Sequence, residues 1–397
     1  MQLVTSVMSD DHVRVTKRHH GKPQLLPVGE LAATCASARD LSMHVWFEDR
    51  VPPKSRKNAL LAACYACGKA AFLKRHGFYT SMCAQCGQLH YEKLMYAGSL
   101  PETYTAVVIG GRTKIGYQTA LRLLRAGATV VTTTRFPERC VFDREPDYAA
   151  WVARLSIKTL DLNQPAVETQ AAIEACLGPA ALPRVDALFI VAAQTIRGIE
   201  RREPVVGAAA VAESAADAAD KSAASTNTNR YGDAKHFCGK INSWCLRLGE
   251  VSPEELEEVM RVNTVGPFLL VQTIAPRIEA SDHPRKAIVL THAREGMFDL
   301  CHKSSRHPHT NVAKAGLHMV THMIQTTYRS SIPCFGVDPG WISVDEYGPD
   351  SVPMGGVLPL TELDGAAKLT DVVLCKKRIL PTRGTIRHYA YGGKPVF

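Results

Sequence analysis

Four cysteines in two short pairs are the residues whose types and spacing indicate a chemistry most directly. They follow a C-x2-C-x15-C-x2-C pattern and comprise Cys64, Cys67, Cys83 and Cys86. Each pair can present two sulfurs to one ion, and the loop between the pairs can complete a tetrahedron with Zn–S distances of about 2.3 Å. Because four thiolates leave no position for water, the pattern predicts a structural zinc ion. The alternatives are free or redox-active thiols, or replacement of one cysteine ligand by His76 or His90.

A glycine-containing turn forms a second candidate site. The apolar run TAVVIG (105–110) leads into GRTKIGYQTALRLL, where Gly110 and Gly116 permit a tight turn and close packing of a helix. The first amides of that helix can bind a pyrophosphate, and Arg112 and Lys114 add positive charge. The next strand ends at Arg135, where an acidic residue would hold a ribose 2′-hydroxyl. Arginine suits a 2′-phosphate, so we expect NADP(H) rather than NAD(H). The alternative is a solvated surface arginine.

Strands and helices alternate from Thr105 onward and would position these residues. Strands are expected at 105–110, 129–134, 156–162, 185–193, 286–292 and 332–340. Helices are expected at 117–127, 147–155, 165–178, 253–278 and 311–329, the fourth with a break at Gly266–Pro267. This alternation predicts an α/β fold, a Rossmann-type doubly wound parallel sheet with helices on both faces.

Composition sets the class of protein. The chain has 397 residues, of which 46% are hydrophobic and 21% charged, which excludes collagen, bulk disorder and coiled coil. No run approaches 18 apolar residues, so no membrane span is expected. The N-terminus has no apolar segment behind a basic start, which argues against secretion. With paired cysteines typical of reduced thiols, these features predict a cytoplasmic protein.

The charge and texture of the chain suggest three parts. Residues 1–57 are expected to be a loosely structured basic arm with a helix near 28–42, and residues 58–98 a compact zinc module. Residues 1–100 hold 13 Lys+Arg against 7 Asp+Glu, a net of +6 out of +9 for the chain. Residues 105–397 would form the nucleotide-binding domain, with a low-complexity insertion at 207–235 that is expected to be mostly mobile.

The order of motifs from about Thr105 to Asp371 resembles the short-chain dehydrogenase/reductase family. IGGRTKIG (109–116) resembles the family's glycine-rich turn, with Lys114 in place of its middle glycine. LDLN, IVAAQT, VNTVGPF and VDPGWIS resemble later motifs in the same order. The resemblance implies cofactor contacts from Gly110, Gly111, Arg112, Lys114, Ile115, Gly116, Arg135, Asp161, Ala192, Lys314, Pro339 and Gly340.

The catalytic positions depart from the family's Ser and Tyr-x-x-x-Lys. Ala293 stands at the serine position, and Thr310 stands four residues before Lys314, where the tyrosine belongs. An aliphatic hydroxyl is a far weaker acid than a phenol, so Thr310 cannot replace it. The candidates for catalysis are Lys314 and Asn263, kept from the pattern, and His309 and His292 as substitute proton donors. Two other YxxxK strings, beginning at Tyr65 and Tyr231, are interpreted as accidental.

Two functions from different classes follow. The first is an NADP(H)-dependent oxidoreductase that transfers hydride to or from a small-molecule carbonyl or alcohol. A homo-oligomer is compatible with this function. The second is a catalytically silent nucleotide-binding scaffold or sensor, whose zinc module and basic arm bind a protein partner. Nucleic-acid binding is the weakest interpretation, because the module lacks an aromatic-rich basic stripe.

Overall fold

The computed structural model describes part of the chain. The described residues are 3–9, 12–17, 24–27, 64–67, 76–79, 81–194, 231, 243–298, 303–342, 359–375 and 386–387. The helix expected near 28–42 lies outside them, as does the 207–235 insertion apart from Tyr231. Among the described residues, no helix is both long and apolar enough to cross a membrane. The chain divides into two compact units, Met1–Ala62 with Val141–Ala153, and Ala63–Cys140 with Arg154–Phe397.

The first unit contains a small antiparallel sheet of order β1-β2-β3. Its strands are β1 (Leu3–Ser9), β2 (His12–Lys17) and β3 (Gln24–Pro27). In the same unit, the Trp151 ring meets Phe142 and Tyr148 edge to face, with centroids 6.3 and 5.2 Å away. The expectation of a helix over 147–155 is wrong, because short 3-10 turns at Tyr148–Ala150 and Val152–Arg154 replace it. The aromatic packing favours these tight turns over a regular helix.

The second unit is built on a seven-stranded parallel sheet. Its strands are β4 (Thr105–Ile109), β5 (Thr129–Thr134), β6 (Leu155–Thr159), β7 (Ala187–Ile190), β8 (Ala287–Thr291), β9 (Cys334–Val337) and β10 (Ile386–Arg387). Their spatial order is β10-β9-β8-β7-β4-β5-β6, with every pair parallel. The chain reverses direction across the sheet between β4 and β7, which confirms the predicted Rossmann-type doubly wound fold.

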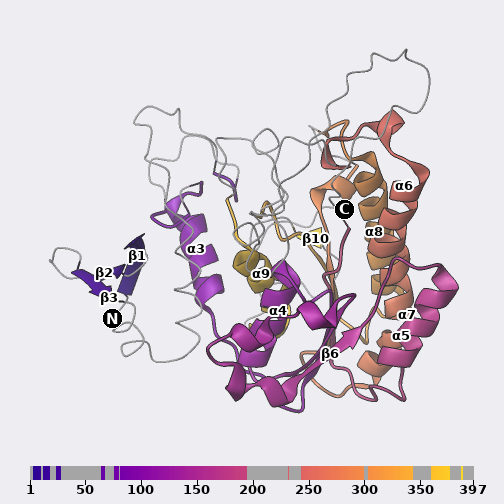
Figure 1. Cartoon of the computed structure of the whole chain (residues 1–397), viewed down its shortest axis with the longest axis horizontal. Helices are drawn as coiled ribbons and strands as arrows, with labels where there is room; N and C mark the ends of the chain where they lie inside the picture. The colour runs from indigo at the N-terminus through magenta and orange to yellow at the C-terminus, as the bar shows by residue number, and fades with distance from the viewer. Residues whose placement is uncertain are drawn as a thin grey trace, which may run out of the picture. The chain divides into compact units, whose positions relative to one another are not determined.

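Helices cover both faces of this sheet (Figure 1). One face packs against α5 (Ala166–Leu177), α7 (Gly266–Ala280) and α8 (Pro308–Thr327). The opposite face is covered by α4 (Lys114–Arg125) and α9 (Glu362–Leu374), which lie against each other. The apolar core on the first face includes Val107, Ile109, Leu188, Ile190, Ile288, Leu290, Ile173, Ile274 and Leu317. Burial on both faces explains why the strands read as continuous apolar runs.

The helical segment before β8 is continuous. α6 (Pro253–Met260) passes through one π-helical turn, Arg261–Val265, directly into α7. The predicted break at Gly266–Pro267 is therefore wrong. Pro267 has no N–H to donate to the carbonyl four residues earlier, and the chain widens by one turn instead of breaking. The Gly266 amide accordingly donates to Arg261 O, five residues back.

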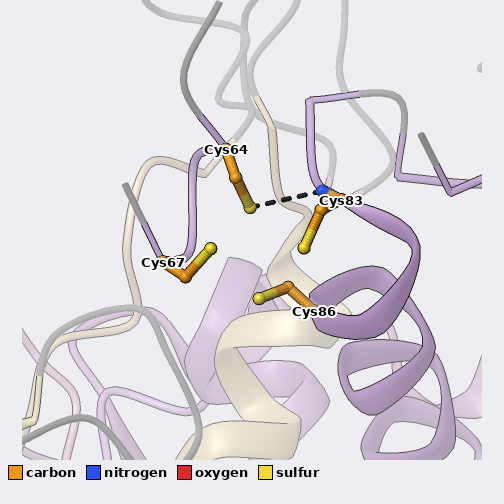
Figure 2. Close-up of side chains that lie close together, drawn as sticks. All are labelled: Cys64, Cys67, Cys83 and Cys86. Atoms are coloured by element: carbon orange, nitrogen blue, oxygen red, sulfur yellow. Dashed lines mark hydrogen bonds between the residues drawn. The ribbon is translucent and has the colours of Figure 1, made fainter. Parts of the chain in front are cut away.

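A helix of the cysteine-bearing segment belongs to the second unit. α3 (Ala84–Met95) begins directly after Cys83, as Figure 2 shows, and packs against α9. The Lys93 ammonium forms a buried ion pair of 2.6 Å with Asp371 on α9. Arg122 on α4 donates to the backbone oxygens of Leu94 and Tyr96 at the end of α3. These contacts join the cysteine-bearing segment to α4 and α9 of the Rossmann-type fold.

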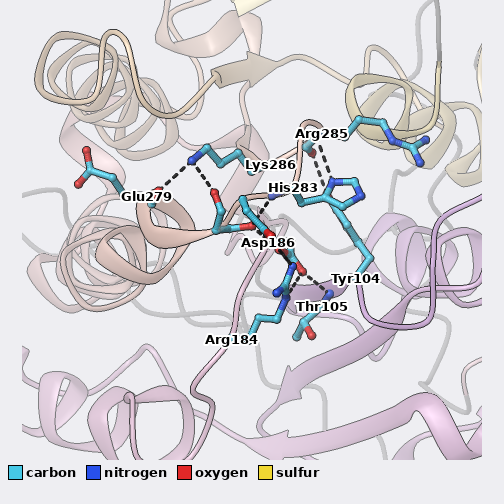
Figure 3. A network of polar contacts seen from close by, with 10 residues as sticks. Tyr104, Thr105, Arg184, Asp186, Glu279, His283, Arg285 and Lys286 are labelled. Atoms are coloured by element: carbon cyan, nitrogen blue, oxygen red, sulfur yellow. Dashed lines mark hydrogen bonds and ion pairs between the residues drawn. The ribbon is translucent and has the colours of Figure 1, made fainter.

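A buried carboxylate organises the edge of the sheet opposite the strands' carboxyl ends (Figure 3). Asp186, fully buried before β7, accepts the Thr105 amide at 2.8 Å and two bonds from the Arg184 guanidinium. The Ser281 hydroxyl also donates to it. One side chain therefore joins the starts of β4 and β7 to the segment that leads into β8.

Replacing Asp186→Asn should lower the free energy of unfolding by about 3 kcal/mol, because the amide nitrogen cannot accept the hydrogen bonds that one carboxylate oxygen accepts from Arg184 and Ser281 at this buried position. Urea denaturation monitored by circular dichroism measures the change. Asp282→Asn is the matched control, since Asp282 also pairs with Arg184, at 3.2 Å, but is 89% exposed. Its cost should stay below about 1 kcal/mol. Equal costs for the two variants would contradict the role assigned to Asp186.

Candidate functional site

The turn between β4 and α4 is closed tightly by backbone contacts. The amides of Gly110 and Gly111 both donate to Thr133 O on the neighbouring strand, each at 3.2 Å. Gly110 has φ +84°, and a Cβ there would lie 2.7 Å from Ala192 Cα. A Cβ on Gly116 would lie 2.1 Å from Gly110 O. The glycines therefore let α4 start against the end of β4, so that its first amides face the carboxyl edge of the sheet.

Lys114 occupies a conformation that glycine normally supplies. Its φ is +53°, in the left-handed region. This is the position at which the sequence carries a lysine in place of the glycine expected from the motif. A non-glycine residue in this region costs about 1–2 kcal/mol. The turn therefore keeps the backbone path of a glycine-rich turn while adding an ammonium group to it.

Three arginines surround one exposed ring beside this turn. The guanidinium carbons of Arg112, Arg135 and Arg139 lie 5.9, 5.3 and 5.4 Å from the centroid of Phe136. Arg112 comes from the β4–α4 turn, whereas Arg135 and Arg139 follow β5. Arg139 was not predicted, because only the 3-10 turn at Pro137–Arg139 brings it back to the ring. The cluster offers concentrated positive charge to an anionic group.

The loops after β6 and β7 hold the next predicted residues. Asp161 is partly buried and accepts the Asn163 amide at 2.9 Å. The Ala192 amide donates to Ile109 O at 2.8 Å, which keeps the loop after β7 beside β4. Asn263, buried in the π-helical turn, exchanges two hydrogen bonds with the backbone of Gln194, at 2.7 and 2.9 Å. Asn263 thus fixes the end of the β7 loop through its side chain.

Lys314 is buried at the carboxyl edge of β8. Its Nζ donates to Thr291 O at 2.9 Å. Burial lowers the pKa of Lys314 to about 8, although Glu295 and Asp338 act in the opposite direction. Thr310, one turn earlier on α8, is fully buried. Ala293, at the expected serine position, follows β8. This edge of the sheet therefore carries a buried ammonium from Lys314, and the hydroxyl of Thr310 lies buried on the same helix.

Charged groups that the sequence analysis missed gather around Lys314. Burial raises the pKa of Glu295, and the Asp338 carboxylate raises it further, while Lys314 lowers it. Lys368 on α9 donates to Pro339 O at 3.0 Å, and burial lowers its pKa to about 7. β8 and β9 are neighbours, so the loops that carry Glu295 and Asp338 leave the same edge. Glu295 and Asp338 could have been identified only from the knowledge that β8 and β9 lie side by side.

The Pro339–Gly340 turn follows β9 at this edge. Gly340 has φ +89°, and its amide donates to the Asp338 carboxylate at 2.8 Å. The Pro339 carbonyl accepts the Lys368 ammonium. A Cβ on Gly365 of α9 would lie 3.2 Å from Ile115 Cγ1 and 3.3 Å from Pro339 Cβ. The predicted residues Ile115 and Pro339 therefore meet on one surface of α9.

The two predicted histidines lie in helix packing contacts. His292 Nε2 is 2.7 Å from the Thr321 hydroxyl, which itself donates to a backbone oxygen, so Nε2 carries the proton. His309 stands about 140° around α8 from Lys314, by helical geometry. Its Nε2 is 3.9 Å from Glu255, and burial lowers its pKa to about 4. His292 thus contacts α8, and His309 lies beside Glu255 of α6.

The four cysteines come together as predicted (Figure 2). Their sulfur atoms all lie within 4.8 Å of one another. The Cys83 amide donates to Cys64 Sγ at 3.2 Å. Although burial opposes it, hydrogen bonding from the backbone lowers the pKa of Cys64 to about 7. A soft donor set in this arrangement fits a tetrahedral metal ion such as zinc.

The alternative histidine ligands have other roles. His76 Nδ1 accepts the amides of Phe78 and Tyr79, at 3.2 and 3.1 Å. Its pKa is lowered by burial. The His90 ring is buried on α3 and meets the Tyr79 ring at a centroid distance of 5.7 Å. Within the described residues, the group that could hold a metal ion consists of the four sulfurs and includes neither imidazole.

The tyrosines of the other two YxxxK strings form structural contacts. The Tyr231 hydroxyl donates to Glu362 at 2.5 Å, and its ring packs against Tyr117 of α4. The Tyr65 hydroxyl accepts the Trp341 amide at 2.7 Å. The lysines that end these strings, Lys69 and Lys235, lie outside the described residues.

Solved structures similar to this chain share low identity with it. A short-chain dehydrogenase/reductase-type protein of Burkholderia multivorans with bound NADP is 21% identical, with 69% of this chain and 91% of that chain covered and a TM-score of 0.46. A citronellol catabolism dehydrogenase of Pseudomonas aeruginosa is 18% identical, with 71% and 91% covered and a TM-score of 0.45. The short-chain dehydrogenase of Shigella flexneri is 15% identical, with 71% and 87% covered and a TM-score of 0.45.

No family model matches the sequence. One curated protein, "Uncharacterized protein R665" of Acanthamoeba polyphaga mimivirus, is 32% identical over 351 residues. The alignment covers 81% of this chain and 73% of the mimivirus protein. At this identity and coverage, the chain belongs to the same protein family as R665.

Proposed function

We propose that this protein binds NADP(H) and acts as an oxidoreductase on a carbonyl or alcohol. The observation that carries the proposal is the β4–α4 turn, where the first amides of α4 face the sheet edge beside three arginines. Such amides suit a pyrophosphate, and the arginine cluster suits a 2′-phosphate. Gly110, Gly111, Ile115 and Gly116 would shape the pyrophosphate site, with Asp161 and Ala192 beside the adenosine.

The residues at the other end of this edge would serve the nicotinamide half. A bound nicotinamide would supply the hydride. Lys314, held by Thr291 O, is the group proposed to hold the nicotinamide ribose, with Pro339 and Gly340 beside the ring. Asn263 acts as a positioning residue through Gln194. Glu295, a partly buried carboxyl in the loop after β8, is the proton donor proposed in place of His292 and His309, because the rings of these histidines pack against helices.

A dinucleotide-binding protein without turnover is the second candidate. It is favoured by one observation, namely that Ala293 and Thr310 occupy the positions of the expected serine and tyrosine. In that case the protein would be a scaffold or sensor. Incubation with NADPH and a panel of aldehydes and ketones, followed at the absorbance of NADPH, separates the two candidates. Turnover that is lost in Glu295→Gln supports the enzyme, and NADPH binding without turnover supports the sensor.

Replacing Arg135→Ala or Arg139→Ala should weaken NADPH binding about tenfold each, because each removes a charge-assisted hydrogen bond to the 2′-phosphate. NADH binding should not change, since NADH lacks that phosphate. Fluorescence titration at fixed ionic strength gives both dissociation constants. Arg329→Ala, an exposed arginine after α8, is the control and should bind NADPH like the wild type. Equal losses for NADPH and NADH would contradict the assignment.

The purified chain should contain one zinc ion, which Cys64→Ser and Cys83→Ser should each lose in large part, because a tetrahedral site needs all four thiolates. Atomic emission spectroscopy on dialysed protein measures the content. Cys140→Ser is the control, because Cys140 is a partly buried thiol outside the cluster. Wild-type protein without zinc, or a variant that keeps its full content, would argue against the metal site.

Lys314→Met should flatten the dependence of stability on pH. Lys314 has a pKa of about 8 in the folded chain against 10.5 ordinarily. The unfolded state therefore binds more protons between pH 8 and 10.5, and the free energy of unfolding of the wild type should rise across that window. Urea denaturation at pH 7 to 10 measures the slope. The variant should also be more stable than the wild type at pH 7, and equal slopes would contradict the buried position of the ammonium.

A further inference from the structure

The cysteine cluster contacts the proposed nicotinamide edge through one of its own turns. Tyr65 lies between the ligand pair Cys64 and Cys67. Its hydroxyl accepts the amide of Trp341 at 2.7 Å, immediately after Gly340. A metal ion held by Cys64 and Cys67 would fix the backbone of this turn and hence the position of the acceptor.

A second chain of contacts reaches the same turn through α9. The Tyr79 hydroxyl donates to Asp364, whose other oxygen accepts the Thr361 amide at the start of α9. One turn further along α9, Lys368 donates to Pro339 O. Tyr79 is joined to the second pair of cysteines, because the amide of Met82, the residue before Cys83, donates to Tyr79 O.

A third contact is apolar and involves the first turn of α4. Ile115 packs in one cluster with Cys64, Tyr79, Met82 and Cys83. Ile342, two residues after Gly340, and Leu360, which pairs with Ile342 in a β-bridge, belong to the same cluster. The metal-binding segment therefore rests on the proposed pyrophosphate turn and on the proposed nicotinamide turn at once.

From these three contacts we propose that zinc and the dinucleotide bind with positive coupling, so that the metal pre-forms the dinucleotide site. Without the metal, the Cys64–Cys67 turn loses its cross-link, and the Trp341 amide and Ile115 lose a fixed support. Ordering them then opposes dinucleotide binding, which is the physical source of the coupling. The proposal rests on the proposed NADP(H) function, and it assigns the cysteine cluster to the site itself instead of to a separate partner.

The test compares NADPH dissociation constants of the full chain with and without zinc. Metal-free protein is prepared with a chelator, and circular dichroism checks that it remains folded. Zinc removal should weaken NADPH binding about fivefold or more. Because the coupling is reciprocal, saturating NADPH should raise the zinc affinity, measured by chelator competition, by the same factor. Equal NADPH affinities for the folded zinc-loaded and zinc-free proteins would overturn the coupling.

Tyr65→Phe tests the same coupling with all four thiolates present. It should retain zinc but bind NADPH about threefold more weakly, since one hydrogen bond to the Trp341 amide is lost. Tyr104→Phe is the matched control, because the Tyr104 hydroxyl donates to Arg285 O at the opposite edge of the sheet. If metal-free protein unfolds, an unchanged affinity in Tyr65→Phe overturns the proposal. If zinc-loaded wild type binds no NADPH, the proposed function itself has failed, and the coupling with it.

Discussion

The close approach of α4 to the end of β4 is the constraint on which the rest of the site depends. Gly110 and Gly111 place two consecutive amides on one carbonyl of β5, and Gly116 brings the helix into backbone contact with Gly110. Nothing larger than hydrogen fits at these positions. The helix therefore begins at the carboxyl edge of the sheet, and the arginines after β5 and the loop after β7 take their places around it.

Charged side chains gather near the carboxyl ends of β8 and β9. Ala293 and Thr310 stand at the positions where a serine and a tyrosine were expected. Beside them, Lys314, Glu295, Asp338 and Lys368 interact within a poorly hydrated region. Burial disfavours the charged forms of Lys314, Lys368 and Glu295, whereas opposite charges nearby favour them. Because the Asp338 carboxylate acts on all three, its removal should shift the pKa values of Lys314, Lys368 and Glu295.

The sequence analysis predicted correctly those elements whose local residue pattern determines their structure. The buried parallel strands read as apolar runs, and 129–134 was predicted with the bounds that β5 has. The glycine turn and the cysteine pairs were found from spacing alone. α9 was missed because Asp364, Lys368 and Asp371 interrupt its apolar pattern, and each is buried with a partner on another part of the chain. Glu295 was missed because its neighbours depend on β8 and β9 lying side by side. Arg139 was missed because a short 3-10 turn brings it to the Phe136 ring.

The contacts of α9 with α3 and with Tyr79 have a consequence for any shortened version of the protein. Asp371 pairs with Lys93, and Asp364 accepts the Tyr79 hydroxyl, both in buried surroundings. A truncated product that starts after α3 would lose the ammonium that pairs with Asp371 and the hydroxyl that donates to Asp364, and α9 should be destabilised. Helix α9 of the Rossmann-type fold therefore depends on side chains that precede β4 in the chain, and a shortened protein must keep them to preserve this packing.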